Sequence, residues 1–156
     1  MNRTELENQG FNQWVPLIEA AELRTLPQLP GVYAVSYAEG YPASWPVTSC
    51  GGWHKGRNPA VDPERLRAKW VDGTDIVYVG MTDRTLAKRI REFARFGKGE
   101  PVGHWGGRLI WQLPDPGRLM VGWIALDAGL ASWREREMLA EFIGTFGRLP
   151  FANLRM

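Results

Sequence analysis

Cysteine and histidine are scarce in the 156-residue sequence, which contains one cysteine, Cys50, and two histidines, His54 and His104. A lone cysteine excludes a disulfide within the chain and favours the reducing cytoplasm as its compartment. A structural zinc ion usually takes four cysteine or histidine ligands. Because Cys50 and His54 supply only two and the rest of the chain offers only His104, we expect no zinc site.

Long apolar runs are also missing. No stretch approaches the roughly 20 apolar residues that span a bilayer, and residues 1–14 contain no apolar segment of signal-peptide length. The glycine-rich stretch at 97–107 lacks the spacing and the terminal lysine of phosphate-binding loops. We therefore expect no membrane partner and no nucleotide cofactor.

Neither sign of charge dominates, since the formal net charge is +2 and 23% of the residues are charged. Such a balance permits a nucleic-acid partner without requiring one. Whether the chain can bind nucleic acid therefore depends on where the charges lie, and not on their sum. The length and the 44% hydrophobic content predict a single domain over residues 1–156.

Hydrophobic periodicity and turn residues predict a mixed order of helices and strands. Residues 1–12 are polar, and we expect them to fray. The expected elements are a helix at 13–25, a strand at 32–38, a strand at 74–81, a helix at 82–96, a hairpin of strands at 108–113 and 119–126, and a helix at 132–146. This order predicts an α+β fold with a small, mostly antiparallel sheet flanked by helices.

Residues 39–73 are rich in proline, glycine, tryptophan and basic side chains, and we interpret them as an insertion between the first two core strands. Asp62 and Pro63 predict the start of a short helix within the insertion. Its cations, which include Lys55 and Arg57, make the insertion a candidate for substrate recognition. A packing lid and a dimer contact are the alternatives.

Two tripeptides, Gly31-Val32-Tyr33 and Tyr78-Val79-Gly80, mark the two expected strands on either side of the insertion. Downstream of them follow, in this order, Arg89, His104, Glu135 and Asn153. Together these features resemble the GIY-YIG nuclease superfamily, over roughly residues 27–155 apart from the insertion.

The resemblance implies a DNA-cutting domain that uses one divalent cation, Mg²⁺ or Mn²⁺. It also implies that Tyr33, Tyr78, Arg89, His104, Glu135 and Asn153 form the catalytic site. Two features depart from the family pattern: the tripeptides are usually closer in sequence, and the helical arginine is often followed four residues later by a histidine, where this chain has Phe93.

The helix expected at 82–96 carries a basic stripe at helical spacing, formed by Arg84, Lys88, Arg91 and Arg95. Such a stripe can follow the phosphates of DNA, and the alternative is an ordinary solvated helix face. Arg89 lies off this stripe, beside the apolar face. A guanidinium there can bind the scissile phosphate, or it can simply extend over the edge of the core.

Three glutamates of the last helix compete for the metal. At about 100° per residue, Glu135 falls on the same face as the apolar residues, whereas Glu137 and Glu141 point away. We favour Glu135, because a carboxylate facing a buried side needs a partner such as a hydrated Mg²⁺. The alternatives are a metal at Glu137 or Glu141, and an ion pair of Glu135 with an arginine and no metal.

The other candidates each have a structural alternative. One of the phenols of Tyr33 and Tyr78 would orient or deprotonate the attacking water, although tyrosines in strands are common at core edges. His104 would move a proton or bind phosphate, or lie in a surface loop. Asn153 would orient the site by hydrogen bonds or cap a chain end. Three tryptophans in loops are candidates for stacking on bases, or for the core: Trp45, Trp53 and Trp105.

The sequence thus predicts hydrolysis of a DNA phosphodiester by in-line attack of water, with Glu135 holding the metal and Arg89 stabilising the phosphoryl charge. A non-catalytic module that binds nucleic acid or protein on the same fold is the alternative. The choice between DNA and RNA stays open at this point, as does a homodimer, which would give a palindromic cutter its two sites.

Overall fold

The computed structural model describes residues 1–38 and 40–156. Glu39, the first residue of the predicted insertion, lies outside the described residues. The α-helices are α1 (Arg3–Asn8), α2 (Pro63–Lys69), α3 (Leu86–Gly97) and α4 (Leu130–Phe146). The strands are β1 (Asn12–Pro16), β2 (Gly31–Ser36), β3 (Ile76–Thr82) and β4 (Met120–Ala125), and the short 3₁₀ helices are η1 (Glu19–Ala21), η2 (Trp105–Gln112) and η3 (Pro116–Arg118).

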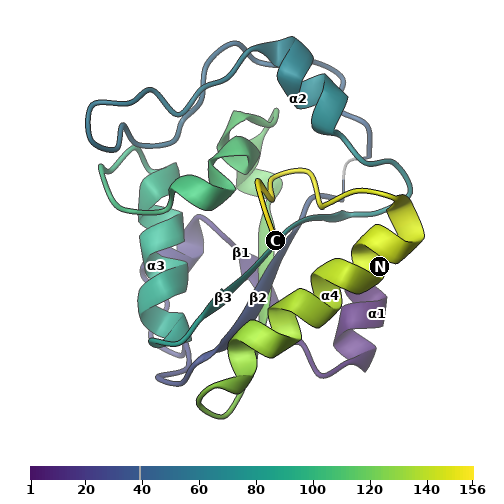
Figure 1. Ribbon diagram of the computed structural model, residues 1–156. Helices are drawn as coiled ribbons and strands as arrows, with labels where there is room; N and C mark the ends of the chain where they lie inside the picture. Colours follow the sequence, from purple (N-terminus) through teal and green to yellow (C-terminus); the bar gives the residue numbers. More distant parts are fainter. Residues whose placement is uncertain (39) are drawn as a thin grey trace.

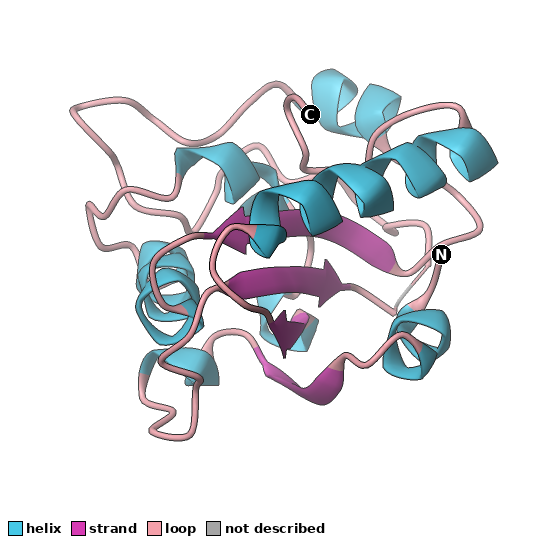
Figure 2. Ribbon diagram, turned by 60° about the horizontal axis from the view of Figure 1, so that its bottom comes forward, coloured by secondary structure: helices cyan, strands magenta, loops and turns pink. Residues whose placement is uncertain are grey.

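The four described strands form one sheet in the order β1-β4-β2-β3, and every neighbouring pair is antiparallel. Helix α3 covers one face of this sheet, and α1 and α4 cover the other (Figures 1 and 2). The predicted α+β fold is confirmed.

Two apolar cores result, one on each face. Along β2, successive side chains point to opposite faces, so Tyr33 and Val35 join the core under α3 while Val32 and Ala34 join the core under α4. Every residue of β2 is buried because the strand lies inside the sheet and both of its faces are covered.

Several predicted elements are confirmed with small shifts at their ends. The strands on either side of the insertion are β2 and β3, and the two long helices are α3 and α4. Helix α3 begins three to four residues later than predicted, because Thr82 still belongs to β3 and the hydroxyl of Thr85 caps the helix by accepting from the Lys88 amide. In α2, Asp62 is the N-cap and Pro63 follows it, as predicted.

The predicted helix at 13–25 is wrong, since this segment forms β1 and the short helix η1. Tertiary pairing overrides the helical spacing here: Val15 pairs with Val121 on β4. The indole of Trp14 also lies over Gly122, where an added Cβ would come within 2.7 Å of it. The apolar residues therefore serve a strand and a turn.

The predicted hairpin of 108–113 with 119–126 is also wrong. Only the second segment is a strand, β4, and it pairs with β1 and β2. The first segment belongs to η2, where the six residues 108–113 are all buried. When every residue of a segment is buried, its apolar residues show neither the two-residue repeat of a strand nor the 3.6-residue repeat of a helix. The sequence of this segment therefore could not distinguish a strand from a helix.

Residues 1–12 are ordered, which corrects the expected fraying. Asn2 and Glu5 form a capping box at the start of α1, in which each side chain bonds the other residue's backbone N–H. Leu6 is fully buried in the core under α4. No helix of the described residues is both long enough and apolar enough to cross a membrane.

Candidate active site

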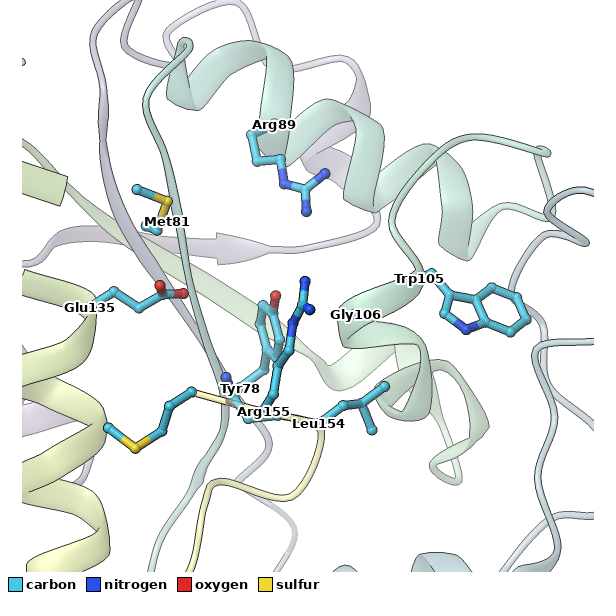
Figure 3. A pocket seen from close by; sticks show the side chains of 10 residues that line it. Tyr78, Met81, Arg89, Trp105, Gly106, Glu135, Leu154 and Arg155 are labelled. Atoms are coloured by element: carbon cyan, nitrogen blue, oxygen red, sulfur yellow. The ribbon is translucent and has the colours of Figure 1, made fainter. Parts of the chain in front are cut away.

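A pocket of about 650 Å³ opens at the free edge of β3, between elements that cover opposite faces of the sheet (Figure 3). Helices α3 and η2 contribute to it from one face and α4 from the other. Its lining residues are Tyr78, Met81, Arg89, Trp105, Gly106, Glu135, Asn153, Leu154, Arg155 and Met156. Four of the six predicted catalytic residues line this one pocket.

Tyr33 and Tyr78 lie on the neighbouring strands β2 and β3 with their ring centroids 6.0 Å apart. Tyr33 is fully buried behind the pocket, whereas Tyr78 lines it. An added Cβ on Gly80 would come within 2.8 Å of both tyrosine rings, and one on Gly31 within 2.2 Å of the Ile124 carbonyl oxygen. The glycine of each tripeptide is thus required by close packing.

His104 is fully buried beside these tyrosines. Its Nε2 lies 2.9 Å from the hydroxyl of Tyr33. Its ring stacks on Phe93 with centroids 3.6 Å apart and an interplanar angle of 5°. Burial, reinforced by the positive charge of Arg89, holds the pKa of His104 well below its usual value, so the imidazole is neutral near pH 7.

The tautomer of His104 follows from its second nitrogen. Nδ1 is buried and has no hydrogen-bond partner among the described residues. A buried N–H without an acceptor costs more than a bare lone pair, so the proton belongs on Nε2. His104 then donates to the oxygen of Tyr33.

Both phenols are neutral in the free protein near pH 7. Burial raises the pKa of Tyr33, although the charge of Arg89 lowers it in part. Burial also raises the pKa of Tyr78 well above its usual value, and the neighbouring Tyr33 adds to this effect. In this state the two phenols can accept or donate hydrogen bonds, but they carry no charge.

Arg89 lies in the first turn of α3, and its guanidinium points into the pocket (Figure 3). Its Nη1 donates to the Gly103 carbonyl at 3.0 Å and lies 3.6 Å from the Glu92 carboxylate. A side-chain hydrogen bond to Tyr33 is its third contact. Glu92 is the one carboxylate that pairs with it among the described residues, and Arg89 lines the pocket. It can therefore fork onto a bound anion.

Glu135 reaches the pocket from α4 and faces it opposite Arg89 (Figure 3). Burial raises the pKa of its carboxyl group, while a hydrogen bond from the Met81 amide and the charges of Arg136 and Arg89 act in the opposite direction. Of its two rivals, Glu137 is exposed and pairs with Arg134, and Glu141 is exposed. Only Glu135 of these three glutamates lines the pocket.

Asn153 binds the free edge of β3 through both ends of its amide. Its Nδ2 donates to the Val79 carbonyl at 2.8 Å, and its Oδ1 accepts from the Val79 amide at 3.0 Å. The Ala152 amide donates to the Val77 carbonyl on the same edge. The C-terminal segment thus satisfies backbone groups that an edge strand leaves open, and it fixes Tyr78 and Gly80 on either side of Val79.

The predicted basic stripe lies outside the pocket, and its cations have other partners. Arg84 forms a two-point ion pair with Glu92, Arg95 bonds Glu100 at 2.7 Å, and Arg91 donates to the Leu23 carbonyl. Lys88 is exposed on the same helix. Two of the stripe's four cations, Arg84 and Arg95, are therefore neutralised by carboxylates within the protein.

The predicted recognition residues of the insertion, Lys55 and Arg57, are exposed in a turn closed by a bridge between His54 and Arg57. Neither lines the pocket. The turn approaches the loop that holds His104, since an added Cβ on Gly103 would lie 3.8 Å from the His54 ring.

The three loop tryptophans lie in different environments. Trp105 lines the pocket, Trp53 is 58% exposed, and Trp45 packs against Trp70 and Phe151. Arg155 also lines the pocket and points toward its centre (Figure 3), and the sequence analysis missed it. Its one sequence signal is its position two residues after Asn153.

Metal binding by this pocket depends on few protein ligands. No group of three or more histidine, cysteine, aspartate or glutamate side chains forms a cluster among the described residues. Mg²⁺ usually keeps several waters and takes one or two carboxylates together with substrate phosphate oxygens. One half-buried carboxylate, Glu135, facing a roomy pocket fits that mode and does not fit an all-protein cage.

Comparison with known proteins found no match among protein-family models, curated protein sequences or solved structures.

Proposed function

We propose that this protein is a metal-dependent endonuclease of the GIY-YIG type that hydrolyses phosphodiester bonds in DNA. One observation carries the proposal: side chains from β3, α3, α4 and the C-terminal segment, far apart in sequence, line one pocket. They are Tyr78, Arg89, Glu135 and Asn153, in the order in which the sequence resembles that superfamily.

Each side chain has a role that its position supports. Arg89 binds the scissile phosphate and stabilises the charge that develops on its oxygens. Tyr78, whose phenol faces the pocket, orients the attacking water, and Tyr33 is held behind it by His104. Asn153 fixes the β3 edge that carries Tyr78.

Glu135 would hold a hydrated Mg²⁺ or Mn²⁺, which when bound supplies positive charge to the departing oxygen. Because burial raises the pKa of Glu135, its carboxylate has reason to gain a cation partner. The lone cysteine favours the cytoplasm as the site of action. A homodimer would supply the second pocket needed to cut both strands of a palindrome.

Cleavage of supercoiled plasmid, single-stranded DNA and RNA with Mg²⁺, Mn²⁺ or EDTA tests the proposal. We expect metal-dependent nicking or linearisation of DNA. Arg89→Ala and Glu135→Gln should each lower the rate by about 100-fold or more, which is the loss seen when one transition-state donor is removed. The matched controls Lys88→Ala and Glu141→Gln change exposed residues of the same helices and should keep the rate.

Two results would overturn this function. Cleavage that survives both pocket substitutions would point to a contaminating nuclease. Binding of DNA without cleavage in any metal would instead assign the fold to the non-catalytic module.

A further inference from the structure

Four cations gather beside the candidate active site. This basic cluster consists of Arg65, Lys69, Arg108 and Arg148. It adjoins the pocket at two points: Lys69 donates to the carbonyl of Asn153 at 3.3 Å, and the guanidinium of Arg108 lies 4.5 Å from the ring centroid of Trp105. Both Asn153 and Trp105 line the pocket.

Arg108 is the unusual member of the basic cluster, because it is only 8% exposed and has no carboxylate partner among the described residues. Its Nη1 donates to the Trp105 carbonyl at 3.3 Å, while its buried Nε has no hydrogen-bond partner in the described part of the chain. A buried guanidinium with an open donor is costly unless an anion completes it.

Lys69 points to the same conclusion. Its pKa is lowered, first by burial and then by the charges of Arg148, Arg65 and Arg108. All three of these neighbouring charges are positive. Arg148 is held in place by carbonyl oxygens of Ala68 and Trp70, which leaves its charge uncompensated. Folding has therefore concentrated positive charge here without supplying an anion.

The basic stripe of α3 is the informative contrast. Arg84 and Arg95 pair with Glu92 and Glu100, so two of the four cations on this face are neutralised by carboxylates. The basic cluster has no ion pair with a carboxylate in the part of the chain that the structure describes. The η2 and α2 side of the pocket thus carries four cations for which no ion pair with a carboxylate is found among the described residues.

We infer that the basic cluster is a second phosphate-binding site, which holds a DNA backbone phosphate next to the one in the active-site pocket. The identity of this anion rests on the proposed function, whereas the anion site itself rests on the geometry above. Arg65 and Lys69, one turn apart on α2, face the phosphate from the insertion, and Arg108 completes it from η2. The insertion would then bind substrate through α2, not through the turn that carries Lys55 and Arg57.

The salt dependence of DNA binding tests this inference. A short DNA duplex is titrated in EDTA at several salt concentrations, so no cleavage is needed. Removing one phosphate contact should reduce the slope of log K against log salt by about 0.9. We expect the double variant Arg65→Gln/Lys69→Gln to reduce this slope by about one to two. By the same counterion argument, it should weaken DNA binding at least tenfold at 0.1 M salt.

The matched control is Arg84→Gln/Arg95→Gln, which removes the same charge from the stripe and should leave the slope unchanged. Lys69→Arg keeps the charge and should preserve binding. Thermal unfolding verifies that each variant is folded, and Arg108 is left intact because it is buried. A changed slope in the control with no change in the cluster variant would overturn the inference and place the DNA on α3. A protein that binds but never cleaves, with the cluster effect intact, would defeat only the nuclease proposal.

Discussion

At the scale of single residues, the glycines of the two tripeptides are steric requirements of the tyrosines. Gly80 pairs with Tyr33 across the sheet, and no room remains for a Cβ between the two tyrosine rings. Tyr33 cannot move away, because its ring contacts Phe93 and its hydroxyl bonds His104. The motif therefore specifies the space around the phenols as well as the phenols themselves.

Gly80→Ala should accordingly destabilise the fold. The added methyl group would lie 2.8 Å from ring atoms of Tyr33 and Tyr78, and overpacking of this kind costs about 1–3 kcal/mol. Urea unfolding measures the loss. The control is Gly144→Ala in α4, where an added Cβ meets nothing within 4 Å, and there we expect a gain of up to about 1 kcal/mol. Equal effects at the two positions would show that the tyrosine rings have room to shift.

At the scale of elements, segments with clear local signals were predicted, and segments whose conformation depends on long-range contacts were not. The apolar, β-favouring run of β2 between Pro30 and Gly40 and the amphipathic pattern of α3 identified both elements. By contrast, β1 takes its conformation from pairing with β4, and η2 from burial on every side. These causes are long-range contacts that one sequence does not display.

The residues of the candidate site likewise fall into those that the sequence predicted and those that it did not. Helical phase alone separated Glu135 from Glu137 and Glu141, because α4 runs without interruption from Leu130 to Phe146 and buries residues of one face. The basic cluster could not be predicted, since it depends on η2, whose type was misjudged, and on the fold of the insertion. Arg155 was missed because no pattern marks it.

The edge of β3 provides the prediction at this scale. Asn153→Ala would leave the amide and the carbonyl of Val79 without their partners, and each buried unsatisfied group costs about 1–3 kcal/mol. We expect a loss of about 2–4 kcal/mol in urea unfolding, together with faster hydrogen exchange at the Val79 amide. The control Asn58→Ala changes an exposed asparagine that bonds the Ala60 amide. A loss as small as the control's would mean that water replaces the Asn153 side chain.

At the scale of the whole molecule, the pocket lies where the two cores end at the same sheet edge. Arg89 belongs to α3, which covers one face of the sheet, and Glu135 belongs to α4, which covers the other face. Opposite charges thus face each other across a pocket (Figure 3), and they are held by helices that pack on different cores. This arrangement keeps them apart and leaves room for a substrate between them.

The stability of the whole fold should depend on pH through His104. Its pKa in the folded protein lies well below that of the unfolded chain, near 6.5. As the pH falls through this window, the unfolded state binds the proton first, so the folded state loses stability by up to about 1.4 kcal/mol per pH unit. The loss ends only when the pH passes the folded pKa.

Thermal or urea unfolding between pH 7.5 and 5.5 measures this dependence. We expect His104→Gln to flatten the slope relative to the wild type, even though losing the bond to Tyr33 lowers stability at pH 7.5. The comparison is made within one buffer series, so that the two proteins differ only at His104. Parallel curves for wild type and His104→Gln would mean that His104 binds its proton as easily in the folded protein as in the unfolded chain. Such a result would place water around an imidazole that the packing of Phe93 and Tyr33 otherwise keeps dry.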